Sequence, residues 1–125
     1  MPRVPLSLLL CCLLMPLLAQ AQCPGVTTQL TPFATEKLTV STTAKGLTAS
    51  VYQPPGTTPA LAQLSVGGGD ICFSVVGTPT LTDCHPVASS GGTSFPICGV
   101  DSIKAFKMIT LNTDANLFVT YYKFK

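Results

Sequence analysis

The sequence is poor in charge, has one histidine and has no tryptophan. Charged residues make up 10% of the 125 positions, and the formal net charge is only +2. A nucleic-acid-binding domain needs a basic face, so no nucleic-acid partner is expected. One histidine and scattered aspartates provide too few ligands for a metal site, and no cofactor is expected. The lack of tryptophan also weakens any platform on which sugar rings could stack.

Long hydrophobic runs are confined to the N-terminus. Arg3 precedes an apolar run over residues 6–18, which ends in "AQA". This order of charge, apolar core and small residues predicts a secretory signal peptide over residues 1–21. Residues 22–125 are then expected to form a single domain that is secreted or periplasmic. The run is short for a bilayer span and no second run follows, so no membrane span is expected after cleavage.

The cysteines that follow the leader are even in number. They are Cys23, Cys72, Cys84 and Cys98, and in an oxidising compartment they predict two disulfides. Three pairings are possible, and the spacing alone does not choose between them. Cys72 and Cys84 lie six residues to either side of Thr78, so a hairpin could place them opposite one another. That arrangement favours a Cys72–Cys84 bridge and leaves Cys23 to pair with Cys98.

Short segments in which apolar and polar residues alternate recur along the chain. In "EKLTVST", Leu38 and Val40 share one face and Lys37 and Thr39 share the other. Only residues 100–106 have helical spacing, and they predict one short helical turn. Many short strands without a long helix predict an all-β fold, a compact antiparallel β-sandwich that is Ig-like or jelly-roll-like. The predicted strands are 36–42, 46–53, 60–66, 70–76, a short one around Phe95 and Ile97, 107–111 and 117–124, with "GGG" and "NTDAN" as turns of strand pairs.

The stretch "GGGDICFSVVGTPTLTDCHP", residues 67–86, contains the residue types that a catalytic site would need. A thiol mechanism would use Cys84 with His85, but neighbouring side chains of an extended chain point to opposite faces. A triad of Ser74, His85 and an aspartate lacks the G-x-S-x-G frame of a nucleophilic serine. We therefore expect no catalytic residue here. The stretch is predicted to be a disulfide-closed hairpin whose glycines permit positive φ.

Three stretches occur in an order that resembles a family of small phage and prophage structural proteins. They are "LSVGGGDICFSVVGTPTLT", "SIKAFKMI" and "LFVTYY", within residues 62–123. The resemblance implies a compact β-sandwich of virion-associated or otherwise structural type, here with a signal peptide and added cysteines, and no catalytic residues. The chain is also similar to chaperone–usher pilins, which share secretion, a disulfide and an alternating C-terminal strand ending in aromatics.

These features favour a non-enzymatic secreted protein with a structural or surface-assembly role. It would be stabilised by disulfides and would contact a protein partner or copies of itself. The candidate contact residues are Tyr52, Tyr121 and Tyr122, together with the 86–94 loop, and ordinary strand packing is the alternative role for the tyrosines. The alternative function is an extracellular ligand- or glycan-binding module, in which loops rich in threonine and serine hold a sugar or a protein partner.

Overall fold

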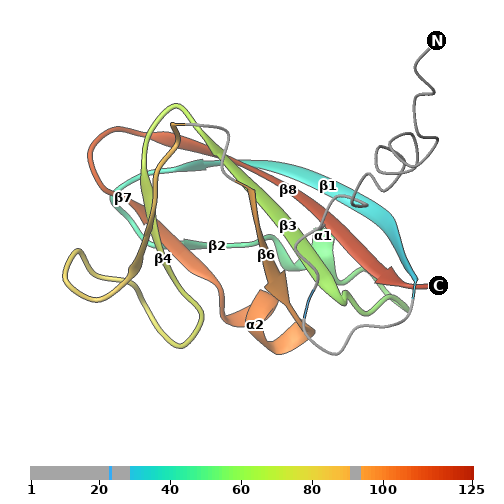
Figure 1. Ribbon diagram of the computed structural model, residues 1–125. Helices are drawn as coiled ribbons and strands as arrows, with labels where there is room; N and C mark the ends of the chain where they lie inside the picture. Colours follow the sequence, from blue (N-terminus) through green and yellow to red (C-terminus); the bar gives the residue numbers. More distant parts are fainter. Residues whose placement is uncertain (1–22, 24–28, 91–93) are drawn as a thin grey trace, which may run out of the picture.

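The computed structural model describes Cys23 and residues 29–90 and 94–125, which form eight strands and two short helices (Figure 1). The predicted signal peptide, residues 1–21, lies outside the described residues. In chain order the elements are β1 (Leu30–Val40), β2 (Lys45–Gly46), α1 (Ala49–Tyr52), β3 (Leu61–Gly67), β4 (Ile71–Ser74), β5 (His85–Val87), β6 (Ser94–Cys98), α2 (Val100–Ala105), β7 (Lys107–Thr110) and β8 (Ala115–Phe124).

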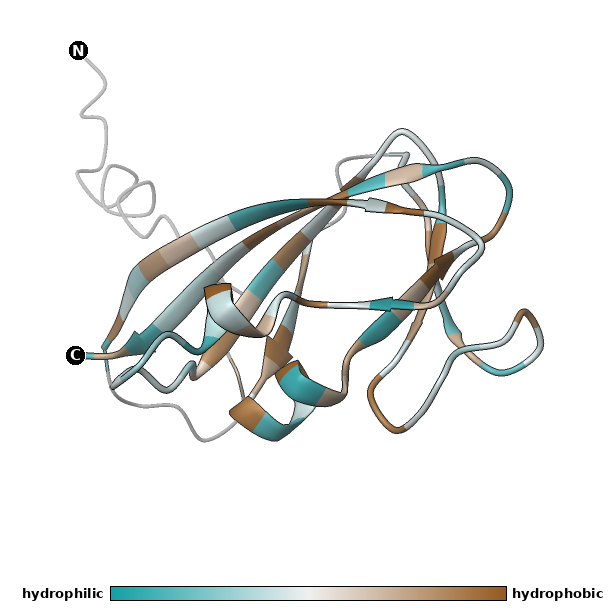
Figure 2. Ribbon diagram, turned by 180° about the vertical axis from the view of Figure 1, so that it is seen from behind, coloured by the Kyte–Doolittle hydropathy of each residue, from teal (hydrophilic) through white to brown (hydrophobic). Residues whose placement is uncertain are grey.

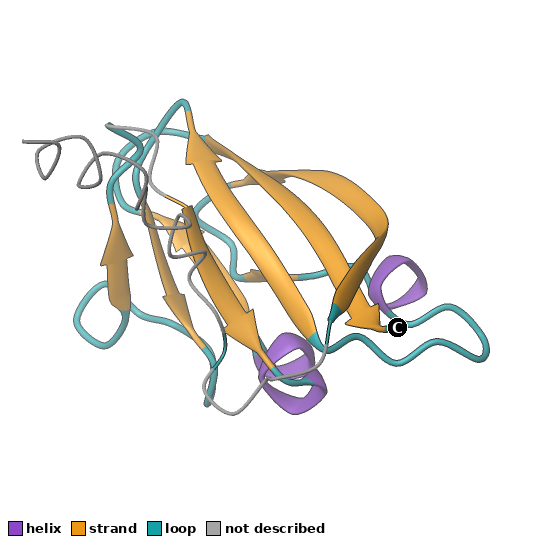
Figure 3. Ribbon diagram, turned by 45° about the vertical axis from the view of Figure 1, so that its right-hand side comes forward, coloured by secondary structure: helices purple, strands orange, loops and turns teal. Residues whose placement is uncertain are grey.

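The strands pair like one long hairpin rolled up on itself. β1 pairs with β8, β2 with β7, β3 with β6 and β4 with β5, all antiparallel. Because β3 also pairs with β8, and β4 with β7, the strands divide into two sheets. Sheet A has the order β1-β8-β3-β6 and sheet B the order β2-β7-β4-β5, and the long strands of sheet A lie side by side in Figure 3. This nested pairing is the jelly roll, so the predicted all-β sandwich is confirmed.

The core lies between the two sheets. Along β8, alternate residues from Ala115 to Tyr121 are buried, whereas Phe118 between them is exposed. Bands of brown and teal along the strands show the same division of apolar and polar residues (Figure 2). The inward faces are therefore apolar, as the alternation in the sequence predicts. Fully buried side chains from sheet A include Leu64 and Leu117, and those from sheet B include Ile71 and Met108.

Three phenylalanine rings join the two sheets at the end of the core where α2 lies. Phe73 on β4 stacks on Phe106, which follows α2, with the ring centroids 5.3 Å apart. Phe73 also stacks on Phe95 of β6, at 5.1 Å. Phe106 is fully buried. The short helical turn predicted at 100–106 is present as α2, and it places Phe106 against Phe73, the central ring of the stack.

One inward-pointing carboxylate ties three elements together. Glu36 of β1 accepts a hydrogen bond from the buried hydroxyl of Tyr121 on β8. It also accepts one from the backbone N–H of Thr48, which precedes α1, at 3.2 Å. The Tyr121 ring lies 6.0 Å from that of Tyr52 in α1. A charged group on the inner face is thus tolerated because its oxygen has two donors.

Alkaline pH is expected to destabilise the fold through Tyr121. Burial raises the pKa of this phenol above its ordinary value of about 10, and the hydrogen bond to Glu36 and the negative charge of Glu36 raise it further. The unfolded chain therefore loses this proton first as the pH rises. The protonated Tyr121 therefore stabilises the fold fully below about pH 10. Above that pH the free energy of unfolding falls by about 1.4 kcal/mol per pH unit.

The measurement is urea unfolding between pH 9 and pH 12 for the wild type and for Tyr121→Phe. The unfolding free energy of the variant should fall less steeply with pH than that of the wild type. The difference between the two slopes should correspond to one titrating proton. Identical slopes for the two proteins would show that the phenol does not contribute.

The segment 46–53 is not the strand that its alternation predicted. Lys45–Gly46 forms only the short β2, and Ala49–Tyr52 forms α1. Leu47 and Val51 are four residues apart and both pack against the core. Leu47 precedes the helix and Val51 lies within it, so both side chains reach the core although the segment is not extended.

Three further differences concern pairing. β1 begins at Leu30, well before the strand predicted from Glu36, and β5 forms where a loop was expected. The "GGG" and "NTDAN" turns do not close strand pairs. Each carries the chain from one sheet to the other, because β3 and β8 belong to sheet A while β4 and β7 belong to sheet B.

The glycine triplet meets two separate requirements. Gly68 has φ of 82°, a conformation that residues with side chains rarely adopt. Gly69 is required for a close approach, because a Cβ there would lie 2.7 Å from the carbonyl oxygen of Thr113 in the β7–β8 turn. The two turns that connect the sheets therefore pack directly on each other.

Candidate functional site

The loop between β4 and β5 is closed by the Cys72–Cys84 disulfide. We call residues 75–84 the hairpin loop; it projects at the lower left of Figure 1, in yellow. The two Cα atoms of the bridge are 5.5 Å apart. Cys72 lies opposite Pro86 in the strand register, so Cys84 stands just before β5 instead of directly opposite Cys72. The bridge therefore clamps the base of the loop at the point where strand pairing ends.

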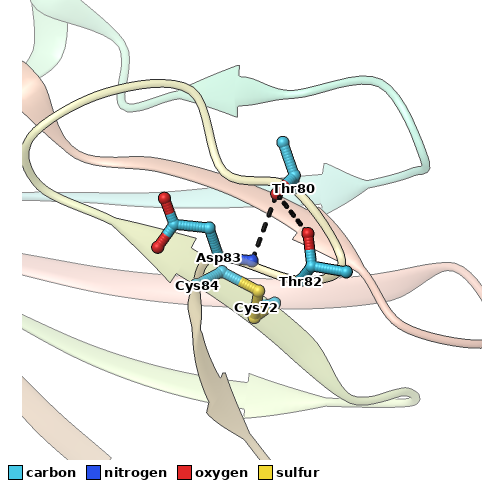
Figure 4. Close-up of a disulfide and its surroundings, with 5 residues drawn as sticks. All are labelled: Cys72, Thr80, Thr82, Asp83 and Cys84. Carbon is cyan, nitrogen blue, oxygen red and sulfur yellow. Dashed lines mark hydrogen bonds between the residues drawn. A yellow bond between two sulfur atoms is a disulfide. The ribbon is translucent and has the colours of Figure 1, made fainter.

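Hydrogen bonds hold the tip of the hairpin loop in one conformation. Thr80 and Asp83 form a two-way backbone bridge, with N–O distances of 3.3 and 3.1 Å. The Thr80 hydroxyl also accepts from the Asp83 N–H at 3.1 Å and lies 3.3 Å from the Thr82 hydroxyl, beside the disulfide (Figure 4). Nearer the base, the Ser74 hydroxyl accepts from the Val76 N–H at 3.2 Å.

The hairpin loop presents two apolar side chains to solvent. Val76 is 94% exposed and Leu81 is 68% exposed, more than the other large hydrophobic side chains of the described residues. Pro79, between them, is buried and anchors the loop. A braced loop loses little conformational entropy on binding, so this loop is a candidate contact surface.

The second disulfide lies at the other sheet. Cys23 is bonded to Cys98 at the end of β6, with the Cα atoms 5.5 Å apart. These are the two cysteine pairs that the sequence favours. Two disulfides fit an extracellular protein that is stabilised by its bridges and formed in an oxidising compartment.

Three of the residues considered for catalysis contact other residues of the fold. Cys84 is bonded to Cys72, and the Asp70 carboxylate accepts from both the backbone N–H and the hydroxyl of Ser89, at 2.8 and 3.2 Å. The His85 ring lies 5.4 Å from the ring of Phe73. These contacts join the two arms of the hairpin on either side of the loop. In the described part of the chain, no three histidine, cysteine or acidic side chains are grouped so that they could hold a metal ion.

Two of the three tyrosines expected to be surface contacts are buried. Tyr121 is fully buried and Tyr52 is 7% exposed, so the expectation that these two are surface residues is wrong. Both rings fill the end of the core near α1, which is the packing alternative. Tyr122 lies on the outward face of β8 and is half-buried. Of the 86–94 loop, residues 86–87 belong to β5, residue 94 begins β6, and residues 91–93 lie outside the described residues.

The edge strands of both sheets carry features that discourage pairing with another chain. β1 has a bulge after Pro32, the inward carboxylate of Glu36 and the outward Lys37. The edge strands β5 and β6 contain Pro86 and Pro96, and β2 has only two residues. Prolines, bulges, inward charges and short edges are the usual protection against edge-to-edge association. The described edges are therefore poor surfaces for strand addition.

Comparisons with protein-family models, with curated proteins and with solved structures give no match to this chain. Within the described residues, neither helix is long and apolar enough to cross a membrane. The exposed apolar residues that sequence reasoning missed are Val76 and Leu81. Alternation placed Val76 within a strand, and only the closed loop shows that these side chains are exposed.

Proposed function

We propose that this chain is a non-enzymatic, secreted or periplasmic protein with a structural or surface-assembly role, and that it contacts a protein partner through the hairpin loop. The observation that carries the proposal is the pair Val76 and Leu81, exposed on a loop that a disulfide and the Thr80–Asp83 bridge hold in place. The partner surface is expected to be an apolar pocket, because Asp83 is the only charged residue of the loop.

The kind of assembly follows from the edges. Pilins assemble by adding a strand to an open sheet edge, and the prolines of β5 and β6 oppose that mode. Contact through a preformed loop does not need a free edge. The jelly roll is used by viral capsid proteins, and this use agrees with the virion-associated role that the resemblance implies. That support comes from analogy of fold alone.

The test compares Leu81 with a matched residue outside the loop. A photo-crosslinking amino acid at position 81 of the disulfide-bonded chain, expressed with its leader, should give a discrete protein adduct, and Val76→Ser should weaken that association about 10- to 100-fold. The estimate follows from burying one aliphatic side chain, about 1.5–3 kcal/mol. The control position is Leu111, which is 39% exposed in the β7–β8 turn and should give no such adduct. A monomer without an adduct at 81, or equal adducts at both positions, would contradict the proposal.

A further inference from the structure

The outward face of sheet A has a groove, and no residue of the hairpin loop lines it. It has a volume of about 480 Å³, within the range of about 300–1,000 Å³ that is usual for small-molecule sites. The side chains that line it come from all four strands of the sheet. Glu36, Leu64 and Val119 contribute only from beneath, because their side chains are directed into the core. The outward lining residues are Thr35, Lys37, Gln63, Ser65, Ser94, Phe118 and Thr120.

Strand register arranges the outward residues in two rows across the sheet. Thr35, Thr120 and Gln63 are direct cross-strand neighbours and form the first row. The second row consists of Lys37 on β1, Phe118 on β8, Ser65 on β3 and Ser94 on β6, each opposite the next. Gln63 crosses between rows by donating a 2.6 Å hydrogen bond to the Ser94 hydroxyl. Hydroxyl and amide groups therefore surround one aromatic ring.

Phe118 is the apolar centre of the groove. Its side chain is 46% exposed, although the core-facing residues on either side of it along β8 are buried. The ring lies beside Gly67, where a Cβ would be 3.6 Å from the Phe118 Cε2 atom, so no side chain from that position covers it. A half-exposed ring among hydroxyl and amide groups matches a sugar, which has apolar C–H faces and a rim of hydroxyls.

Lys37 gives the groove a positive charge. Its ammonium nitrogen lies 5.4 Å from the centre of the Phe118 ring. Among the outward residues of the groove it is the one charged side chain, since the Glu36 carboxylate is held by Tyr121 and Thr48. An anionic group on the ligand would therefore meet a cation and no opposing carboxylate.

We infer that this groove binds a saccharide that bears a carboxylate, with the exposed part of Phe118 against the sugar ring and Lys37, whose ammonium lies over the Phe118 ring, on the carboxylate. Gln63, Ser65 and Thr120 would receive the hydroxyl groups. This site is separate from the hairpin loop, so its failure would leave the proposed protein contact untouched, and the reverse also holds.

The test is calorimetric titration of the disulfide-bonded mature chain with oligogalacturonate. Phe118→Ala should weaken binding at least tenfold. Lys37→Gln should weaken it similarly and reduce its dependence on salt. Two controls are matched in chemistry but lie outside the groove: Phe124→Ala, whose ring is 52% exposed at the end of β8, and Lys107→Gln on sheet B. Both should bind as the wild type does.

Three results would overturn the inference. The first is no heat of binding with oligogalacturonate. The second is equal binding of poly-glutamate, which would identify a site for acidic peptides or for charge alone. The third is binding that Phe118→Ala leaves unchanged. Equal thermal stability of Phe118→Ala and Phe124→Ala would establish that any loss comes from the groove.

Discussion

Replacing both Cys23 and Cys98 by alanine is expected to lower the free energy of unfolding by about 4 kcal/mol. The bridge joins residues 75 positions apart, so its removal frees a long loop in the unfolded chain. For a domain of this size, a loss of that order lowers the Tm by at least about 15 °C. Urea unfolding and differential scanning calorimetry of the variant under oxidising conditions measure both quantities.

The Cys72–Cys84 pair provides the comparison. Its separation is 12 residues, and the same relation gives about 3 kcal/mol for its removal. The double variant without Cys72 and Cys84 should thus be the more stable of the two, but it should lose the braced hairpin loop and the protein contact proposed for it. A chain without Cys23 and Cys98 that unfolds within 1 kcal/mol of the wild type would contradict the expected role of the long-range bridge.

Phe106→Ala is expected to cost about 3–5 kcal/mol, because it removes a fully buried ring and leaves a cavity. The ring is the contact between α2 and Phe73, and Phe73 stacks in turn on Phe95. The neighbouring rings have little freedom to fill the space, since they are held by strands of different sheets. Urea unfolding followed by circular dichroism measures the loss.

Phe124→Ala is the matched control for Phe106→Ala. It removes the same side chain from a position that is 52% exposed, and it should change stability by less than about 0.5 kcal/mol. A loss below about 1 kcal/mol for Phe106→Ala would show that the stack collapses without cost and does not hold the two sheets together.

Local pattern was sufficient to predict much of the fold. The alternation from Leu117 to Lys123 separated the residues of β8 into two faces, and the residues around Ile103 identified α2. These elements were predictable because the alternation or helical spacing lies within their own residues. The all-β class followed from composition and from the alternation of apolar and polar residues. The position of Cys72 and Cys84 about Thr78 favoured the two observed cysteine pairs but left the other pairings open.

Pairing between distant residues was not predictable in the same way. The start of α1 is fixed by a hydrogen bond from Thr48 to Glu36, twelve positions earlier, which no local pattern reveals. His85–Val87 contains a proline and was predicted as loop, but an edge strand can accept a proline on its unpaired side. The "GGG" turn connects two sheets because β3 takes its partners from β6 and β8, both far along the chain.

Local pattern was also insufficient to predict which candidate contact residues are exposed. Tyrosines attract attention in a sequence as contact residues, yet Tyr121 fills the core and donates to Glu36. Phe118, only three positions away, is exposed, and strand alternation had already placed the two on opposite faces. The sequence does not provide which face of β8 the second sheet covers, and that choice decides which of the two rings is buried and which is exposed.

The nested strand order also determines when the protein can fold. β1 has a single neighbour in its sheet, and that neighbour is β8, the last strand. During synthesis from the N-terminus, β1 has no partner until β8 has been made, and β3 lacks one of its two. Contacts between such distant segments make folding slow. Sheet A can therefore be completed only after β8 has been synthesised. A truncation that removes β8 would leave β1 without a neighbour in its sheet and β3 with β6 alone, so the shortened chain is not expected to keep a partial fold.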